Sequence, residues 1–311
     1  MNARLQDLPF DPASLHGLSE KLLRSHHQNN YGGAVKRLNA IRAQLSTLDF
    51  GTAPGFQLNG LKQEELVATN SMLLHELYFG SMGGHGQGQG QPMVPAMTLA
   101  LEASFGSVAR WRDEFVAMGK ALGGGSGWVL LSFQPRDGSM VNQRAADHTQ
   151  CLAGGVPILA MDMYEHAYHM DFGAAAGGYV DAFMDNINWA AVYARYQAAV
   201  HGVGESLGAT QDDLAKAPQA LVLDVRRAGV FEQASKVLPG SRWADPALVD
   251  QWASELAAAQ EVVVYCVYGH EVGRSTALRL RAAGLNARFL LGGIDGWAKA
   301  GLALASKGVA S

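Results

Sequence analysis

Apolar residues recur at three- and four-residue steps over the first part of the chain, a pattern that predicts helices. The first helical stretch covers 18–48, with Ser19 as a suitable N-cap. A second covers 62–79 and ends at a glycine-rich segment, 80–92, that cannot hold a helix. A third helix is predicted over 100–115.

Two apolar runs of strand length follow these helices. They are GWVLLSF at 127–133 and VPILAMD at 156–162, and both predict buried strands. Two helices, followed by further helices on a small sheet, make an α+β domain.

The pattern changes near residue 200, where a polar segment predicts a linker at 201–217. Strand-like and helix-like stretches then alternate: ALVLDVR, a helix at 246–259, EVVVYC, a helix at 274–283, ARFLLGG and a terminal helix. Such alternation predicts a parallel sheet covered on both faces. We therefore expect one domain at 1–200 and a second at 218–311.

Composition supports two domains and narrows the class of partner. With 311 residues and 48% apolar content, the chain can bury two cores. The net charge of -4 gives no basic excess, so no nucleic acid partner is expected. The chain has no signal-peptide pattern and no run of 18 apolar residues, so we expect a cytoplasmic protein without a membrane segment. Its two cysteines, Cys151 and Cys266, are expected to be free thiols.

The string DMYEHAY at 162–168 carries a carboxylate and an imidazole four residues apart. On a helix, Asp162 and His166 would share one face and could bind one metal ion; a solvated helix face is the alternative for that spacing alone. Together with INW at 187–189, the string resembles the DVWEHAY and VNW signature of the iron/manganese superoxide dismutases. The resemblance runs from about residue 8 to residue 197. It implies a helical hairpin, then an α/β part with a small antiparallel sheet, and dismutation of superoxide to dioxygen and hydrogen peroxide.

The resemblance also places the other metal ligands. LHELYF is similar to the family's second ligand segment and makes His75 a ligand, while AVKRLN aligns without a gap when His26 is the first ligand. His27 is the competing choice, and a slip of one residue would rotate the side chain by about 100°. With Asp162 and His166, this set implies one iron or manganese ion per subunit. Zinc would bind such nitrogens but has no redox chemistry.

The sequence departs from the family at the substrate gate. The gate histidine and tyrosine correspond to Asn30 and Ala34, and a new tyrosine stands at Tyr31. These three differences put the delivery of protons in question more than the metal site itself.

Near the metal, one aromatic residue matches the family and two are changed. Trp128 matches, whereas Phe79 and Tyr164 stand where the family usually has tryptophans. His148 resembles a histidine that replaces the family's outer glutamine in some members and would tune the potential of the metal by hydrogen bonding; a polar loop residue is the alternative. Because the sequence does not fix the tautomer of His148, it does not decide between iron and manganese. His85, in the glycine-rich segment, is predicted to be solvated, with a weak surface metal site as the alternative.

The resemblance implies a homodimer formed through the first domain. In the family, the glutamate corresponding to Glu165 crosses the subunit interface and orients the partner's last histidine ligand. A second interface pair corresponds here to His169 and Asn30.

The second domain resembles the rhodanese family over about 218–304. ALVLDVR, VLPGS and LLGGIDGWAKAGL match a strand, a turn and the terminal segment of that family. The resemblance implies an α/β domain in which Cys266 transfers sulfur from a small donor. A cysteine between a parallel strand and a helix meets N–H groups that favour the thiolate; a buried core cysteine is the alternative.

The loop after Cys266 is larger than the family's loop. In CVYGHEVGRS, Arg274 lies eight positions after the cysteine, and Glu271 lies between them. We expect Glu271 to point outward, with His270 or Arg274 compensating its charge. A phosphatase or an arsenate reductase would need a five-residue gap between cysteine and arginine, where this chain has seven.

Two classes of function follow. The first is a superoxide dismutase joined to a sulfurtransferase. The alternative is a metal-binding module with weak or no dismutase activity, joined to a non-catalytic rhodanese-like sensor or interaction domain.

Overall fold

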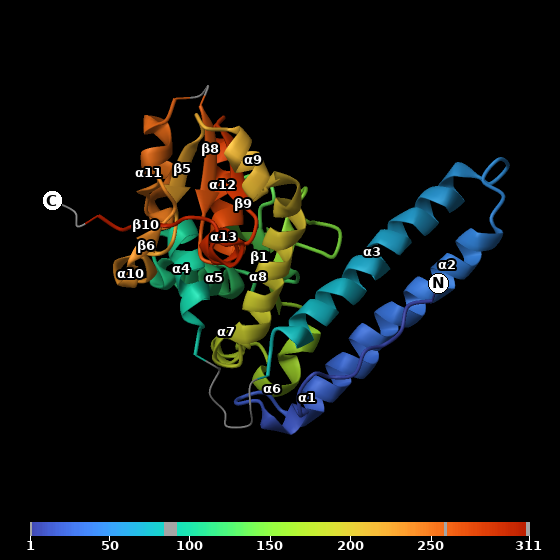
Figure 1. Cartoon of the computed structure of the whole chain (residues 1–311). Coiled ribbons are helices and arrows are strands. Elements are labelled where there is room, and N and C mark those ends of the chain that lie inside the picture. Colours follow the sequence, from blue (N-terminus) through green and yellow to red (C-terminus); the bar gives the residue numbers. More distant parts are fainter. Residues whose placement is uncertain (1, 84–91, 258–259, 309–311) are drawn as a thin grey trace.

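A long helical hairpin projects from one side of the molecule (Figure 1). A computed structural model describes residues 2–83, 92–257 and 260–308, so His85 lies outside the described residues. The first arm of the hairpin joins α1 (Glu20–Ser25), a π-helical turn (His26–Tyr31) and α2 (Gly32–Thr47), and α3 (Gly55–Gly80) forms the second arm. Ser19 caps α1 as expected, because its hydroxyl accepts a hydrogen bond from the Leu22 N–H.

The third predicted helix is two helices, α4 (Pro95–Phe105) and α5 (Val108–Ala121). Gly106 has a φ of 83° and ends α4 in the left-handed conformation, and Ser107 caps α5. The prediction of one continuous helix over 100–115 is therefore wrong, because the apolar periodicity continues across a glycine that turns the backbone.

A three-stranded antiparallel sheet follows, in the order β2-β1-β3. It consists of β1 (Trp128–Phe133), β2 (Met140–Ala145) and β3 (Val156–Asp162). The runs at 127–133 and 156–162 form strands as predicted, whereas β2 is mostly polar and is not recognised in the sequence. α6 (His169–Phe172), α7 (Ala176–Asp185) and α8 (Trp189–Gly204) complete the α+β arrangement, and they confirm its class.

The C-terminal part contains a five-stranded sheet in the order β4-β9-β8-β5-β7, and every neighbouring pair in it is parallel. Its strands are β4 (Gly208–Ala209), β5 (Leu221–Asp224), β7 (Arg242–Trp243), β8 (Glu261–Tyr265) and β9 (Asn286–Leu290). The helices are α9 (Gln211–Lys216), α10 (Ala228–Gln233), α11 (Val249–Trp252), α12 (Glu271–Ala282) and α13 (Gly293–Lys299). A two-stranded sheet joins β6 (Lys236–Val237) to β10 (Ala305–Ser306). The predicted parallel sheet is confirmed.

Two expected segments differ from the structure. The expected linker at 201–217 contains the end of α8, strand β4 and helix α9. A two-residue strand is too short to give an alternation signal, and a polar helix lacks an apolar stripe. The helix expected at 246–259 is broken, up to residue 257, into α11 and two 3₁₀ turns.

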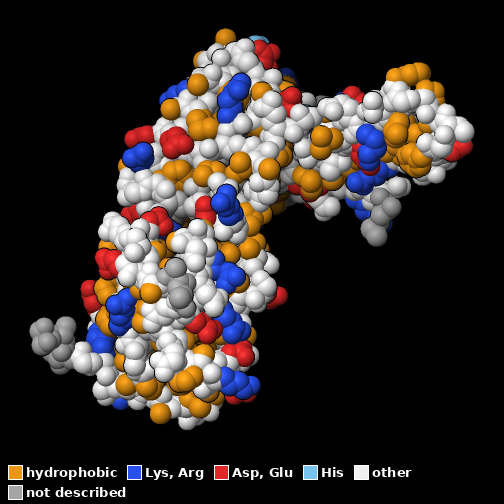
Figure 2. All heavy atoms as spheres, turned by 90° about the horizontal axis from the view of Figure 1, so that it is seen from above, with side chains coloured by type: hydrophobic (Ala, Val, Ile, Leu, Met, Phe, Trp, Pro, Cys, Tyr) orange, Lys and Arg blue, Asp and Glu red, His pale blue; other side chains and the backbone are white. Residues whose placement is uncertain are grey.

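The two parts of the molecule pack against each other through α8 and α12. Leu278 of α12 belongs to the apolar core of the first part. Figure 2 shows positive and negative side chains interspersed over the face that it presents, without a continuous basic surface. Within the described residues, each helix is too short or too polar to cross a membrane.

Candidate metal centre

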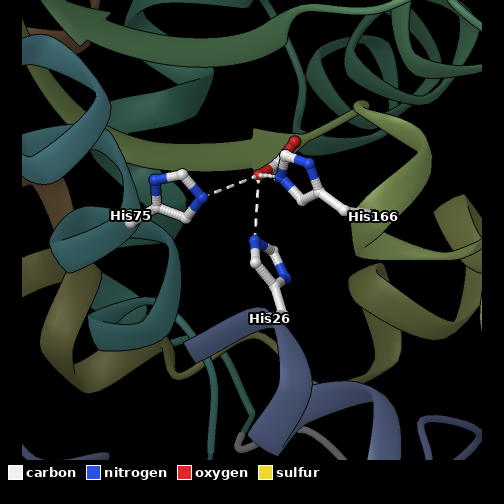
Figure 3. Close-up of side chains that lie close together, drawn as sticks. His26, His75 and His166 are labelled. Atoms are coloured by element: carbon white, nitrogen blue, oxygen red, sulfur yellow. Dashed lines mark hydrogen bonds and ion pairs between the residues drawn. The ribbon is translucent and has the colours of Figure 1, made fainter. Parts of the chain in front are cut away.

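Three imidazoles surround one carboxylate oxygen in the interior of the first domain (Figure 3). The Asp162 Oδ2 atom lies 3.1 Å from the Nε2 atom of His26 and 3.2 Å from that of His166. The Nε2 atom of His75 lies 3.5 Å from the same oxygen. All four ligand atoms lie within 4.8 Å of one another. The structure therefore brings together the four side chains that the sequence singles out.

The π-helical turn carries two neighbouring histidines, and one of them faces this cluster. His26 is buried and points inward, whereas the Nε2 atom of His27 lies 2.8 Å from the carbonyl oxygen of Gln6 in the N-terminal segment. Each helical residue advances the side chain by about 100°, so the two rings must face different ways. The alignment that selects His26 agrees with this geometry.

His75 is held in a state that can accept a metal ion. Its Nδ1 atom lies 2.6 Å from the backbone carbonyl of Ser71 and donates a hydrogen bond to it. The lone pair is then on Nε2, which is buried and has no hydrogen-bond partner among the described residues. An unpartnered buried nitrogen that faces two other imidazoles and a carboxylate fits a metal ion.

Asp162 is placed by the sheet, and not by a helix. It is the last residue of β3 and lies opposite Trp128 of β1. Its Oδ1 atom accepts a hydrogen bond from the Tyr164 N–H, and its backbone carbonyl accepts one from the Tyr179 hydroxyl. His166 follows in a 3₁₀ turn, so the expected single helical turn between the two residues is wrong. A strand end followed by a tight turn brings the side chains together instead.

Burial and charge set the protonation of the cluster. Burial lowers the pKa of His75 to about 3 and also lowers that of His26, so both rings are neutral near pH 7. For Asp162, burial favours the protonated acid, but His166 and the hydrogen bonds of His166 and His26 hold its pKa below the usual range. A divalent transition-metal ion binds imidazoles in their neutral form, so a set of three imidazoles and one carboxylate suits it.

Aromatic and imidazole rings line the side of the cluster that faces the gate. Trp128 is fully buried, lies edge-on to His75, and donates its indole N–H to the Nδ1 atom of His148 at 2.9 Å. Tyr164 stacks between the rings of His148 and His166. Because an indole N–H only donates, neutral His148 must carry its proton on Nε2. Burial lowers the pKa of His148, which favours this neutral form.

The altered gate borders an open pocket. Asn30 and Ala34 lie with Arg37, Ser71 and His148 around a volume of about 340 Å³. The side chain at position 34 is only the methyl group of alanine.

Tyr31 lies apart from this pocket. Its hydroxyl donates to Glu76 and accepts from the Gln6 N–H, while its ring packs on His27. The ring also stacks on His75, but the hydroxyl binds Glu76 and Gln6, and Tyr31 does not line the gate pocket.

Glu165 and His169 are exposed on the surface next to His166. Neither side chain has a hydrogen-bond partner within the part of the chain that the structure describes.

A second candidate site surrounds Cys266, which directly follows β8. A pocket of about 170 Å³ is lined by Cys266, Arg227, His270 and Glu271, among others. Burial raises the pKa of the thiol, and the backbone N–H groups of residues 268, 269, 270 and 273 counteract this effect. The expected N–H groups are therefore present, but burial outweighs them.

Gly293, the first residue of α13, packs against the backbone of the Cys266 loop. A Cβ atom at Gly293, whose φ is 56°, would lie 2.4 Å from the Cys266 carbonyl oxygen. The Ile294 N–H donates to that carbonyl at 3.0 Å. Glycine is needed here because two backbone segments approach closely.

Two residues of the Cys266 loop lie elsewhere than expected. Arg274 is outside the Cys266 pocket and donates to the carbonyl of His201 on α8. Glu271 is buried, not directed outward, and accepts a hydrogen bond from the Tyr193 hydroxyl. The sequence does not reveal these contacts, because both partners belong to the other part of the molecule. It also misses Arg227, the residue after the DVR string, which carries a positive charge to the pocket.

Comparisons with known proteins identify a family for each half of the chain. The profile described as iron/manganese superoxide dismutases, C-terminal domain, matches residues 93–195, and that of the rhodanese-like domain matches residues 209–300. A protein of Cupriavidus metallidurans named superoxide dismutase [Fe] is 63% identical over 196 residues, which cover 63% of this chain and 97% of that protein. Superoxide dismutase [Mn] 2 of Haloferax volcanii is 32% identical, over 64% of this chain and 98% of the relative. Superoxide dismutase [Fe] of Aquifex aeolicus is 31% identical, over 61% of this chain and 89% of the relative.

Proposed function

The chain belongs to the iron/manganese superoxide dismutase family, and from this membership we propose that it converts superoxide to dioxygen and hydrogen peroxide. His26, His75, Asp162 and His166 would hold one iron or manganese ion per subunit. The convergence of these four side chains in the interior is the observation that carries the proposal. Iron is the ion we expect first, because the relative with 63% identity is named for iron.

When bound, the ion supplies the one-electron chemistry that oxidises one superoxide to dioxygen and reduces another to peroxide, with two protons consumed. The protein holds the ligands in fixed tautomers. The Ser71 carbonyl keeps the proton of His75 on Nδ1, and the Tyr164 N–H and Tyr179 hydroxyl fix Asp162. Trp128 and Tyr164 restrict the access of water to the cluster.

His148 is the residue that we propose to supply a proton to the reacting oxygen. Its Nδ1 atom accepts from Trp128, so the Nε2–H is the only donor on the ring. The ring lies between the gate pocket and His75. His148 would thus supply a proton in place of the gate tyrosine, whose position is Ala34 in this chain.

We also propose a cytoplasmic homodimer in which Glu165 accepts a hydrogen bond from His166 of the other subunit. The proposal is supported by the exposure of Glu165 and by the lack of a partner for its carboxylate in the described part of the chain. A carboxylate in this place would fix the outer nitrogen of a ligand histidine.

The test of the dismutase proposal is metal analysis of the full chain with a superoxide-consumption assay. We expect about one iron or manganese ion per subunit by the ligand chemistry, with activity after reconstitution with one of these two ions and none with zinc. His26→Ala should lose metal and activity together, while His27→Gln is the matched control and should keep both. Stoichiometric metal in His26→Ala, or an inactive protein with either ion loaded, would contradict the proposal.

A second activity is proposed for the C-terminal domain: transfer of sulfur through a persulfide on Cys266. The match to the rhodanese-like domain and the N–H groups around the thiol support it. The thiolate would attack the outer sulfur of a donor such as thiosulfate, and sulfite would leave with the electron pair of the broken S–S bond. The phosphatase alternative is weaker, because Arg274 is outside the Cys266 pocket.

Mass spectrometry of thiosulfate-treated protein tests this second activity. We expect a gain of one sulfur on Cys266 and none on Cys151, which is exposed in the first domain. Modification of Cys151 alone, or no modification with several donors, would leave the domain as a sensor or interaction module.

A further inference from the structure

The helix that begins at the Cys266 loop packs directly on the dismutase domain. α12 starts at Glu271, and its first turns face α8. The Tyr193 hydroxyl of α8 donates to the Glu271 Oε1 atom at 2.8 Å, and Arg274 donates to the His201 carbonyl at 2.9 Å. Glu271 and Arg274 are only 8% and 9% exposed. The dismutase domain therefore binds both charged residues of the enlarged loop.

Glu271 borders two cavities at once. It lines the Cys266 pocket on one side and a cavity between the two domains on the other. A carboxylate beside a thiol disfavours the thiolate, because two like charges would then share a poorly solvated space. The direction in which this carboxylate points consequently affects the reactivity of Cys266.

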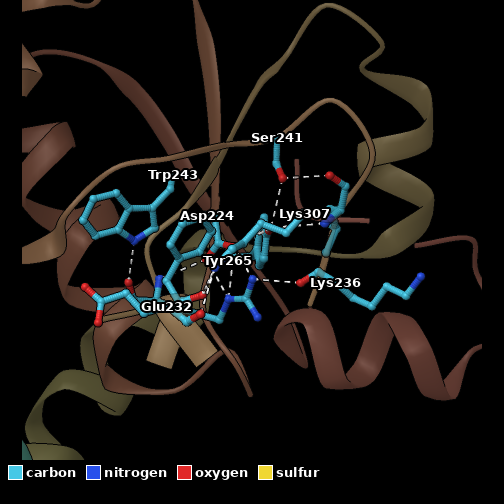
Figure 4. Close-up of polar contacts among 10 residues, drawn as sticks. Asp224, Glu232, Lys236, Ser241, Trp243, Tyr265 and Lys307 are labelled. Carbon is cyan, nitrogen blue, oxygen red and sulfur yellow. Dashed lines mark hydrogen bonds and ion pairs between the residues drawn. The ribbon is translucent and has the colours of Figure 1, made fainter. Parts of the chain in front are cut away.

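The positive charges at the Cys266 pocket are not equivalent. Arg226 is bound by both oxygens of Asp224, which also accepts from Tyr265 (Figure 4). Its charge is therefore already balanced. Arg227 has no ion pair within the described residues; its guanidinium donates to the Ala96 carbonyl of α4 at 3.3 Å. Arg227 is thus the cation that remains for an anion in the pocket.

Tyr193 is suited to hold the carboxylate. Burial and the adjacent Glu271 raise the pKa of its hydroxyl, so Tyr193 is a neutral donor near pH 7. The hydrogen bond is partly buried and crosses from one domain to the other.

We propose that Tyr193 of the dismutase domain is a positioning residue for the rhodanese-like site: its hydroxyl holds Glu271 against α8, so that the Cys266 thiolate faces Arg227 and not a free carboxylate. The inference rests on the proposed role of Cys266 as a nucleophile. The other titratable groups around this pocket are His270 and Tyr268 of the loop, with His201 of α8 beside His270.

The test measures the alkylation of Cys266 by iodoacetamide in the full-length protein as a function of pH, followed by mass spectrometry. Tyr193→Phe keeps the ring and removes the hydrogen bond. The midpoint of the pH profile of alkylation in Tyr193→Phe should move to higher pH by about half a unit to one unit. The alkylation rate of this variant at pH 7 should fall about threefold to tenfold. Glu271→Gln should move the midpoint below that of the wild type. The double variant with Tyr193→Phe and Glu271→Gln should then have nearly the same midpoint as Glu271→Gln alone.

Tyr196→Phe is the matched control, because its hydroxyl interacts with Ser275 at the same interface. It should leave the profile unchanged, as should each variant at Cys151. An unchanged midpoint in Tyr193→Phe, an equal shift in Tyr196→Phe, or an undiminished Tyr193→Phe effect in the Glu271→Gln background would overturn the inference. If Tyr193→Phe fails to fold, Glu271→Gln alone decides, and an unchanged midpoint there also overturns it. Alkylation needs no sulfur donor, so a failure of sulfur transfer would leave this result interpretable.

Discussion

At the scale of single residues, His148 is the side chain that we propose as the proton donor in place of the altered gate. Ala34 offers no hydroxyl and the hydroxyl of Tyr31 is bound to Glu76, whereas the Nε2–H of His148 borders the gate pocket. The hydrogen bond from Trp128 leaves the Nε2–H as the free donor of this ring.

We predict that His148→Ala keeps the metal ion and loses about tenfold to a hundredfold in dismutase activity, as other residues that support a metal site do when removed. His148→Gln should keep most of the activity, because an amide can accept from Trp128 and donate with its N–H₂ group. Steady-state superoxide consumption at equal metal content checks both. Full activity in His148→Ala would show that the proton comes from elsewhere.

Asp162 and His166 could be predicted from their four-residue spacing, whereas His26 and His75 are placed by the resemblance of the strings beside them to the family. The contact of Arg274 could not be predicted, since its partner is a backbone carbonyl on a helix about 70 residues earlier. The Ser71 carbonyl beside His75 is also invisible in a sequence pattern, because every residue has a carbonyl.

At the scale of elements, periodicity predicted what is long and strongly patterned. The hairpin arms and the apolar strands β1, β3 and β8 belong to this group. The elements that were predicted wrongly or missed depend on one residue or on tertiary pairing. Gly106 divides a helix, and β4 is a strand only because it pairs with β9. The polar strand β2 is likewise defined by its pairing with β1.

The π-helical turn at 26–31 is an element that no periodicity predicted. It inserts an extra residue into the helical repeat, and so changes the register of the α2 side chains relative to those of α1 and of His26. A regular helix would continue the same register into α2, so this local irregularity belongs to the candidate metal site.

At the scale of the whole molecule, the proposed homodimer depends on the surface around Glu165. We predict that Glu165→Ala shifts the protein from dimer toward monomer and lowers its metal content together, because in the proposed dimer this carboxylate orients a ligand histidine of the other subunit. Sedimentation at micromolar concentration with metal analysis checks this. Asp185→Ala, which also removes an exposed carboxylate, is the control and should change neither. A dimer of unchanged stability with full metal in Glu165→Ala would place the interface elsewhere.

The segment from α8 through β4 to α9 contains no site at which the chain could be cut without removing contacts of one domain. The last turns of α8 contact α12, and the next residues supply the edge strand of the parallel sheet. A cut before residue 200 would leave the C-terminal half without the surface that covers α12. A cut after residue 210 would leave β9 with an open edge, which invites pairing between molecules. The two domains thus share a structural boundary, and each depends on its neighbour for a complete surface.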